Sequence, residues 1–467
     1  MTAVDPRRAA PGDAAISLPR RVAFVLLAID TVGLVLSFNL AFWLRLDITP
    51  WFTLGMLVPL GLILLSLYVF DTYVLEQQVS GLRPPARAVL GVGVAGLLTG
   101  AAVYGGGFWG TDSTFGRGIF PVAFAFQAVW SAFWRFYLGQ WVREQVEQVR
   151  WLVIGTGEQA RSLYEDFVRS KARGEMRFLA DRGDEHGAPS ELAPIGTLDD
   201  LERVASEPWS GVVIALSDPA PEPLVHQLMS LRFSGLRVYG IVDFYEQMWF
   251  KVPVLHTKRG WLVFGKGFDL LHNPLGLRIK RLLDVFLAFT LLVIALPAMA
   301  LVALLIRVGS RGPVIFTQTR TGLGGIEFEI LKFRSMTQDA EQDGPKWAQD
   351  ADRRITRIGR AIRAFHVDEL PQLVNVLKGE MSFIGPRPER PVFNATLEKS
   401  IPLYGLRHLV RPGITGWAQV MYPYGASVED AREKLQYDLY YIKNYSVLLD
   451  IGIVFKTIRV VLFGKGR

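Results

Sequence analysis

Long hydrophobic runs dominate the first third of the chain. Four of them carry little or no charge, and each is close to the length of about 17–25 residues that a membrane-spanning helix needs. They are Val22–Leu44, Phe52–Phe70, Ala88–Tyr104 and Gly118–Trp134. Together they predict a four-helix transmembrane bundle over residues 1–145.

Basic residues beside these runs predict how the bundle is oriented. Arg21 precedes the first run, Arg83 lies between the second and third, and Arg143 follows the fourth. Because cytoplasmic loops are enriched in Lys and Arg, both ends of the bundle should lie in the cytoplasm. Asp30 lies inside the first run, and we expect it to bond a neighbouring helix or lie near the interface. A functional intramembrane charge is the alternative.

A fifth apolar run, Val285–Ile306, has a different pattern. It is long enough to span a membrane, but basic residues flank both ends, with Arg281 before it and Arg307 after it. Neither orientation of a spanning helix suits this arrangement. Pro297 lies inside the run and should kink it. We therefore expect a re-entrant membrane helix over residues 282–306 that enters and leaves by one face. An ordinary kinked span is the alternative.

The segment 146–262 predicts a cytoplasmic α/β domain of the Rossmann-like type. A buried strand from Trp151 leads into a turn with Gly155, Gly157 and Ala160, and an amphipathic stretch follows. This order matches the glycine turn with which dinucleotide-binding domains approach a pyrophosphate. The glycine pattern alone does not distinguish a nucleotide site from a fold used for packing, regulation or dimerisation.

Further strands, Gly211–Leu216 and Leu236–Val242, predict a parallel sheet in this domain. The acidic residue expected about 20 positions after the glycine turn is not clearly placed. The segment Asp181–Pro194 is polar, contains Gly and Pro, and is expected to be a loop. These features favour a structural or regulatory role.

The last part of the chain, residues 263–467, concentrates the chemically informative residues. Alternation in Phe328–Met336 predicts a strand with Lys332 and Arg334 on one face and Phe333 on the other. Two cations at this spacing can hold a diphosphate. An exposed charged edge strand is the plainer interpretation.

Two adjacent carboxylates, Asp368 and Glu369, precede a helix that we expect to begin at about Leu370. Pro371 suits its first turn and Gly379 its end. The N-terminus of a helix favours negative charge and attracts phosphate. One carboxylate could attack while the other holds a metal, although a plain capping pair is the commoner use of such residues. Arg363 lies close enough in sequence to reach the same phosphates.

Two proline-containing turns present further cations. Arg387 stands between two prolines in Gly-Pro-Arg-Pro, which restrict the backbone and suit bidentate phosphate contact. Arg411 begins the second turn, Arg-Pro-Gly-Ile-Thr-Gly-Trp. A rigid turn with an exposed arginine is the alternative for each.

Composition narrows the class of protein. Hydrophobic residues make up 50% of the 467 residues, and the net charge of +7 suits anionic partners such as lipid headgroups or phosphorylated substrates. The absence of cysteine excludes disulfides and thiolate metal sites, and none of the six histidines forms a zinc-hydrolase motif.

The ordered motifs Lys-Phe-Arg-Ser-Met, Asp-Glu-Leu-Pro-Gln-Leu, Gly-Pro-Arg-Pro and Arg-Pro-Gly-Ile-Thr-Gly-Trp resemble those of the polyprenyl-phosphate hexose-1-phosphate transferases. The resemblance covers Arg278–Arg467. The bundle and the Rossmann-like domain are similar to the large, exopolysaccharide-initiating branch of these bacterial sugar transferases. One departure is His366-Val367 before the acidic pair, where the family more often has a small hydroxyl residue.

The resemblance implies a reaction in which a UDP-hexose and undecaprenyl phosphate give undecaprenyl-diphosphate-sugar and UMP. It implies Asp368 as the nucleophile that forms a covalent aspartyl-phosphosugar, Glu369 as a ligand of Mg²⁺, and phosphate contacts from Lys332, Arg334, Arg363, Arg387 and Arg411. Glucose or galactose is the expected sugar, with N-acetylated sugars as alternatives. The expected location is the cytoplasmic face of the bacterial inner membrane, among membrane lipids, with no nucleic-acid partner; a homodimer is one option.

Two other functions remain open from the sequence. A metal-dependent glycosyltransferase could use Asp350 and Asp352 as its metal pair, and it would release UDP rather than UMP. A membrane scaffold whose middle domain senses a nucleotide would form no lipid-linked product.

Overall fold

The computed structural model describes residues 11–73, 82–105, 118–147, 149–172, 174–181, 192–216, 219–257, 267–337, 354–422, 425 and 427–463. The chain forms two compact units, Met1–Met248 and Trp249–Arg467. The first holds a helical bundle and a parallel sheet, and the second holds the acidic pair.

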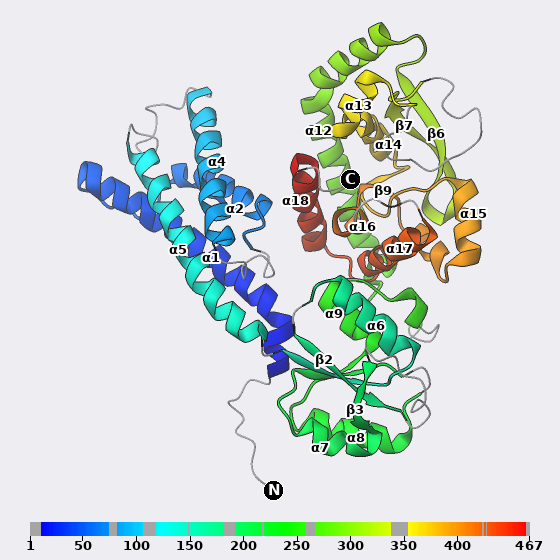
Figure 1. The fold of residues 1–467 in the computed structure, drawn as a ribbon. Coiled ribbons are helices and arrows are strands. Elements are labelled where there is room, and N and C mark those ends of the chain that lie inside the picture. Colours follow the sequence, from blue (N-terminus) through cyan, green and yellow to red (C-terminus); the bar gives the residue numbers. More distant parts are fainter. Residues whose placement is uncertain are drawn as a thin grey trace. The chain divides into compact units, whose positions relative to one another are not determined.

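Four helices form the bundle (Figure 1), namely α1 (Pro11–Leu46), α2 (Leu57–Val69), α4 (Arg83–Gly105) and α5 (Ile119–Glu147). Helix α5 packs along α1 and α4, and α4 also packs along α2. Stretches of α1, α4 and α5 are long and apolar enough to cross a membrane, which agrees with three of the predicted spans.

The second predicted span, Phe52–Phe70, is shorter in the structure than expected. A 3₁₀ turn, η1 (Leu54–Met56), precedes α2, and the apolar helical stretch covers Leu54–Val69. The Asn39 side chain accepts a hydrogen bond from the N–H of Trp51 and donates one to its carbonyl, both at 2.8 Å. These bonds hold the chain outside helical conformation at Trp51, whose φ is +56°.

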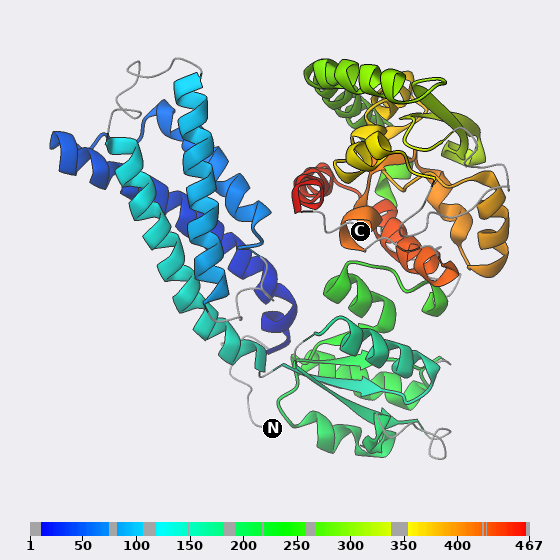
Figure 2. The same ribbon diagram turned by 45° about the horizontal axis from the view of Figure 1, so that its top comes forward.

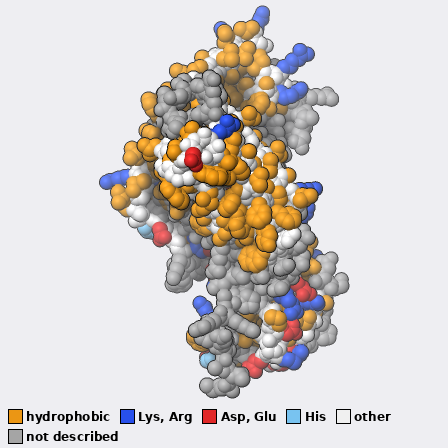
Figure 3. Space-filling view, turned by 90° about the vertical axis from the view of Figure 1, so that its left-hand side faces the viewer, with side chains coloured by type: hydrophobic (Ala, Val, Ile, Leu, Met, Phe, Trp, Pro, Cys, Tyr) orange, Lys and Arg blue, Asp and Glu red, His pale blue; other side chains and the backbone are white. Residues whose placement is uncertain are grey.

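The bundle has an apolar interior and an apolar exterior. Phe38, Phe42 and Leu67 are completely buried in its core, whereas Phe24 and Leu97 are largely exposed. In Figure 3, hydrophobic side chains gather on the upper and middle part of the face that this view presents. A helix that is apolar on all sides is typical of a membrane environment.

Asp30 bonds neighbouring elements of the bundle, as predicted. The Arg135 guanidinium donates to both carboxylate oxygens of Asp30, at 3.0 and 2.8 Å. Ser131 and Tyr73 donate one further hydrogen bond to each oxygen. The paired side chains of Asp30 and Arg135 are fully buried. This network connects α1 with α5 and with the segment that follows α2.

A five-stranded parallel sheet follows the bundle, in the order β3-β2-β1-β4-β5. Its strands are β1 (Arg150–Ile154), β2 (Glu175–Ala180), β3 (Pro194–Thr197), β4 (Gly211–Ile214) and β5 (Val238–Gly240). Its helices are α6 (Glu158–Arg169), α7 (Leu201–Ala205), α8 (Glu222–Phe233) and α9 (Ile241–Trp249), with a 3₁₀ turn η4 (Leu198–Asp200) before α7. Figure 1 shows α6 and α9 on one face of the sheet and α7 and α8 on the other. The predicted parallel sheet is confirmed.

The glycine turn of this domain is set by close packing. Gly155 has a φ of +112°, and a Cβ at this position would lie 2.6 Å from the carbonyl oxygen of Ala215. The first turn of α6 carries the acidic Glu158, which is unfavourable for a phosphate. Asp181 directly follows β2, at the end of the strand where the sequence did not clearly place an acid. The loop predicted over Asp181–Pro194 lies for the most part outside the described residues.

The second unit contains the remaining elements. They are η5 (Val254–His256), α11 (Asp269–His272), α12 (Pro274–Gly309), β6 (Ile315–Thr321), η6 (Leu323–Gly325), β7 (Glu327–Phe333), α13 (Arg357–Ala364), η7 (Val367–Glu369), α14 (Gln372–Lys378), β8 (Ser382–Ile384), α15 (Pro391–Ser400), η8 (Tyr404–Leu409), β9 (Gly413–Thr415), α16 (Trp417–Met421), α17 (Val428–Lys443) and α18 (Val447–Phe463). Strands β6 and β7 form an antiparallel hairpin, and β8 pairs with β9 in parallel.

The segment before α11 packs on this unit. Lys251 Nζ lies 2.6 Å from a carboxylate oxygen of Glu433, and the Trp417 indole donates to the carbonyl of Phe250. The chain predicted as the end of the middle domain thus joins the second unit from about Trp249 onward. The three-part division of the chain at residues 145 and 262 stays a prediction.

Helix α12 is the longest apolar element of the second unit. It contains Pro297, and Figures 1 and 2 show that its axis changes direction along its length. Before the proline, Ala288 packs with Leu373 of α14; after it, Ile306 packs with Ile362 of α13. Both halves of the helix therefore lie against the same unit, while most of its central apolar side chains are exposed.

Candidate active site

The acidic pair lies in the 3₁₀ turn η7, immediately before α14, rather than inside the helix itself. His366, at the start of this turn, has a left-handed backbone with a φ of +56°. Gly379 ends α14 in the left-handed conformation that glycine adopts easily. The predicted helix and its end are confirmed, and the helix begins two residues later than the expected Leu370.

Asp368 has no direct polar partner. Its side chain is buried, with 9% of the residue exposed, and it makes no hydrogen bond or ion pair with any described residue. Burial and the neighbouring Glu369 raise the pKa of Asp368, while Lys332, Arg363 and Arg387 oppose this effect from a distance. A carboxylate that is shielded from water and has no partner retains its capacity to attack or to accept.

Glu369 is held by two cations. Its Oε1 accepts a hydrogen bond from Lys332 Nζ at 2.8 Å and from Arg387 Nη2 at 2.6 Å. Burial alone would raise the pKa of Glu369, but the charges and hydrogen bonds of Arg387 and Lys332 hold this pKa well below its usual range. Burial also lowers the pKa of Lys332, and the nearby Arg387 adds to that effect. The two acidic neighbours therefore have opposite electrostatic environments.

The strand β7 brings Lys332 to this group but not Arg334. Phe333 is buried on the opposite face from Lys332, as predicted. Arg334 lies beyond the end of β7, and its guanidinium donates to the carbonyl and hydroxyl oxygens of Ser310, at the end of α12. A helix end leaves carbonyl groups without helical partners, which attracts such a cation. In this structure Arg334 therefore bonds Ser310, while Lys332 bonds Glu369, and the joint contact of the two cations with a diphosphate stays a prediction.

The Gly-Pro-Arg-Pro turn is fixed through its carbonyl groups. Because proline has no N–H, the backbone of this segment can be held mainly by hydrogen bonds that its carbonyl groups accept. Four successive carbonyls, from Pro386 to Glu389, each accept a hydrogen bond of 2.9–3.0 Å. The donors are Gly413 N–H, the Arg407 and Arg320 guanidinium groups and Thr321 N–H. This network holds the backbone of Arg387 while its side chain reaches Glu369.

The Arg-Pro-Gly-Ile-Thr-Gly-Trp turn supports its neighbour. A Cβ at Gly413 would meet the backbone of Gly385, so both glycines are needed for the two turns to approach. Arg411 donates to the carbonyl of Gly379, at the end of α14 opposite to the acidic pair. The structure therefore does not bring Arg411 to Asp368 and Glu369. Its cation pairs with the negative end of a helix.

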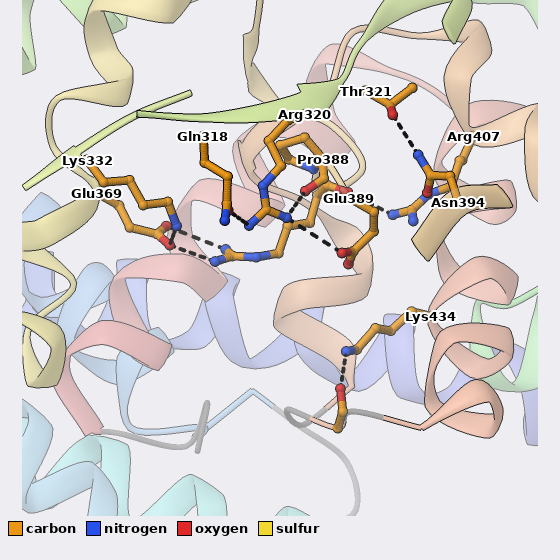
Figure 4. Close-up of polar contacts among 12 residues, drawn as sticks. Gln318, Arg320, Thr321, Lys332, Glu369, Pro388, Glu389, Asn394, Arg407 and Lys434 are labelled. Carbon is orange, nitrogen blue, oxygen red and sulfur yellow. Dashed lines mark hydrogen bonds and ion pairs between the residues drawn. The ribbon is translucent and has the colours of Figure 1, made fainter. Parts of the chain in front are cut away.

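Further charged residues surround Arg387 that the sequence analysis did not single out. Figure 4 shows Lys332 and Glu369 on one side, Arg407 on the other, and Arg320 between them. Burial lowers the pKa of both Arg320 and Lys434. The positive charge of the nearby Arg387 lowers each pKa further. No sequence motif marks Arg320, Arg407 or Lys434. The only signal for Arg320 is its position opposite Phe328 in the β6–β7 hairpin.

The region around Arg387 is also hollowed. A small hollow, with room for about one water molecule, is lined by Arg387, Arg407, the two prolines and the neighbouring residues Thr321, Gly322, Glu389, His408, Val410 and Pro412. Of its two arginines, Arg407 is paired with Asp438, whereas the partly exposed Arg387 can present its guanidinium to an anionic group.

The residues present do not fit a Mg²⁺ ion bound to Glu369. Its carboxylate is already paired with two cations, which would repel a third. Within the described part of the chain, no group of three or more acidic or histidine side chains could hold a metal. Asp350 and Asp352, the metal pair of the rival glycosyltransferase hypothesis, lie outside the described residues.

Residues 275–464 match the family model described as bacterial sugar transferase. A UDP-N-acetylgalactosamine-undecaprenyl-phosphate N-acetylgalactosaminephosphotransferase of Aeromonas hydrophila is 47% identical over 49% of this chain and 53% of its own length. An undecaprenyl-phosphate glucose phosphotransferase of Komagataeibacter xylinus is 37% identical over 67% of this chain and 59% of its own length.

A UDP-glucose:undecaprenyl-phosphate glucose-1-phosphate transferase of Caulobacter vibrioides is 45% identical over 38% of this chain and 68% of its own length. This chain thus spans a little over half the length of the first two relatives. The matched family segment contains the acidic pair, Lys332 and Arg387.

Proposed function

Because this chain belongs to the bacterial sugar transferase family, we propose that it transfers a hexose 1-phosphate from a UDP-hexose to undecaprenyl phosphate. The products would be undecaprenyl-diphosphate-sugar and UMP, which is the first membrane step of an exopolysaccharide or O-antigen. The observation that carries the proposal is the buried Asp368, which bonds no other described residue and lies next to Glu369 with its two cations, Lys332 and Arg387.

In the first step, a carboxylate oxygen of Asp368 attacks the phosphorus that bears the sugar. A P–O bond forms to Asp368, the P–O bond to UMP breaks, and UMP leaves with the electron pair. Asp368 suits this role because its oxygens bond no other residue in the described part of the chain. The cations of Lys332 and Arg387 lie beside it and can stabilise the charge that develops on the phosphoryl group.

In the second step, a phosphate oxygen of the polyprenyl acceptor attacks the same phosphorus. The P–O bond to Asp368 breaks, the carboxylate is restored, and undecaprenyl-diphosphate-sugar leaves. Each step forms one P–O bond and breaks another, so no oxidant or external base is required. Glu369 would keep Lys332 and Arg387 in place through both steps.

We further propose that any Mg²⁺ enters with the diphosphate of the donor, rather than from a site on Glu369. Mg²⁺ commonly binds substrate phosphates and keeps several waters, and Glu369 is occupied by cations. The mechanism above therefore rests on the chain's own residues. Binding of Mn²⁺, measured by electron paramagnetic resonance, should be weak without UDP-sugar and should increase when the donor is added.

Helix α12 supports the proposed location at the cytoplasmic face of the inner membrane. Its two halves contact the same unit on either side of Pro297, and its middle is exposed and apolar. A re-entrant helix would place the acidic pair beside a lipid-borne phosphate without crossing the bilayer. A reporter fused after Arg467 should be active in the cytoplasm; activity only in the periplasm would contradict this topology.

The reaction is tested with the full chain in nanodiscs containing undecaprenyl phosphate. A panel of UDP-glucose, UDP-galactose and their N-acetylated forms is added with Mg²⁺, and the nucleotide product is identified. Release of UMP with a lipid-linked sugar is expected. UDP as the product would favour the glycosyltransferase hypothesis, and absence of any lipid product would favour the scaffold. The relatives' names include both glucose and N-acetylgalactosamine, so the panel also determines the sugar.

A further inference from the structure

The two ends of α12 use their basic residues differently. At the first end, Lys280 pairs with Asp450 at 2.9 Å, and Arg281 donates to the carbonyls of Val376 and Leu377 at the end of α14. These cations therefore hold the helix against its own unit. At the second end, Arg307 and Arg311 are exposed, and neither forms an ion pair with a described residue.

Helix α13 adds more unpaired positive charge at this second end. Arg357 and Arg360 are exposed, and neither has a carboxylate partner among the described residues. The helix itself, Arg357–Ala364, contains no acidic residue. Four arginines on α13 and at the end of α12 thus form a cationic surface that no described carboxylate neutralises.

Packing fixes α13 beside the last turn of α12. The side chain of Ile358 lies directly against Gly309, and Gly359 lies directly against the carbonyl of Ser335. Ile362 is buried with Ile306 and Phe333. The buried face of α13 is therefore fully used, which leaves its arginine-bearing face directed away from the unit.

Apolar side chains accompany these arginines. Val308, next to Arg307, is 79% exposed, and Phe365, directly after α13, is 69% exposed. Exposed apolar residues next to unpaired arginines are typical of elements that lie in the interface of a membrane, where the apolar part enters the acyl region and the cation stays among the headgroups.

We propose that Arg307, Arg311, Arg357 and Arg360 form a binding surface for the headgroups of anionic phospholipids. The choice of a lipid rather than another anionic partner rests on charge complementarity and on continuity with the exposed apolar part of α12. The surface holds the unit at the bilayer from the far end of α12, opposite to the end that Lys280 and Arg281 anchor internally. This inference rests on the proposed membrane location of α12, but not on the transfer reaction.

The test measures how strongly nitroxide-labelled lipids of two headgroup types quench a fluorophore attached to the full chain. Because the chain has no cysteine, Ala361→Cys provides a single site for a fluorophore on the exposed face of α13. The labelled protein is placed in nanodiscs that contain a nitroxide-labelled lipid, either phosphatidylglycerol or phosphatidylcholine, with the nitroxide at the same position of the acyl chain. A label at Ser230→Cys, exposed on α8, serves as a control position.

At α13, quenching by phosphatidylglycerol should exceed quenching by phosphatidylcholine by at least about twofold. Each basic residue near an anionic membrane surface can enrich anionic lipid around it by about fivefold. The triple variant Arg311→Gln, Arg357→Gln, Arg360→Gln should bring this ratio close to one. The triple variant Arg161→Gln, Arg169→Gln, Arg203→Gln removes the same charge from exposed sites of the sheet domain and should leave the ratio unchanged.

High salt supplies a second measurement that needs no variant. It should lower the ratio in the wild-type chain, because screening weakens contacts between exposed charges. Equal quenching by the two lipids, an unchanged ratio in the first triple variant, or no quenching by either lipid would overturn the proposal. Since turnover is not measured, failure here is separate from failure of the proposed reaction.

Discussion

Two buried charge clusters, one in each unit, use similar residues differently. In the bundle, each carboxylate oxygen of Asp30 accepts two hydrogen bonds, and Arg135 neutralises the charge of this carboxylate. In the second unit, Glu369 is shared by Lys332 and Arg387, and Asp368 beside it bonds no other described residue. Every carboxylate oxygen of the first cluster is bonded, whereas the second cluster has two cations on one carboxylate and leaves the other carboxylate without a bond among the described residues.

The difference shows what a buried charge needs in order to be functional. A bidentate pair with every carboxylate oxygen occupied is already satisfied and can only hold elements together. A cluster whose cations outnumber its bonded acids is completed by an anionic ligand. The comparison therefore separates burial, which both acidic side chains have, from complete hydrogen bonding of the carboxylates, which only the bundle cluster has.

The largest effect should follow from removing the uncommitted carboxylate. We expect Asp368→Asn to lower turnover by about 10⁴-fold or more, because the amide keeps the shape but cannot act as the attacking nucleophile. UMP release measures turnover, and mass spectrometry of the wild-type chain with UDP-sugar alone should detect a phosphosugar on Asp368.

The matched control is Asp243→Asn, an exposed acid of the sheet domain, which should leave turnover unchanged. Both variants should unfold at the wild-type temperature. Turnover of Asp368→Asn at the wild-type rate would refute the assignment of the nucleophile.

Breaking the balanced cluster should affect stability instead. We expect Arg135→Leu to destabilise the bundle by about 3–5 kcal/mol, because it leaves the Asp30 charge buried without a counter-charge. The double variant Asp30→Leu, Arg135→Leu removes both charges and should recover most of this loss. Denaturation in detergent, followed by proteolysis of the bundle, compares the two. A double variant less stable than Arg135→Leu would contradict a purely structural pair.

Two arginines of proline-containing turns should give different phenotypes. We expect Arg387→Gln to lower kcat/KM by about 10²–10³-fold, since it removes a preorganised donor from the cation cluster. Arg411→Gln should lower stability by about 1 kcal/mol through its lost bond to Gly379, with kcat/KM of the folded enzyme almost unchanged. Equal losses of kcat/KM in the two variants would show that Arg411 also acts on substrate.

The grouping of several charged residues in the second unit is readable from the sequence, whereas their roles stay predictions. The acidic pair, Lys332 and Arg387 could be predicted because local patterns place them: strand alternation for Lys332, prolines around Arg387, and a helix start after Glu369. The parallel sheet and three long bundle helices were equally readable, since hydrophobic periodicity and run length reflect burial directly.

The failures have a tertiary origin. Arg334 follows the alternation of β7 in sequence, but the strand ends first and Ser310 supplies an acceptor from a distant helix end. Arg411 is captured by the carbonyl of Gly379 in the same way. Arg320 and Arg407 were missed because no local pattern reveals a donor that binds the backbone of a remote turn.

The smallest expected effect concerns the pH dependence of the reaction. Burial and Glu369 raise the pKa of Asp368, so its carboxylate should be protonated at a higher pH than an ordinary aspartate. As the pH is lowered, activity should therefore begin to fall at a higher pH than it would with an ordinary aspartate, because only the ionised form attacks.

Glu369→Gln removes the neighbouring negative charge and frees Lys332 and Arg387 to act on Asp368. The acidic limb of kcat/KM should then move to lower pH in the residual activity. Lys332→Met removes an opposing positive charge and should move the same limb to higher pH. Shifts of both variants in one direction would show that the limb reports another group. Opposite shifts would identify Asp368 as the titrating nucleophile and Glu369 as the residue that sets its charge.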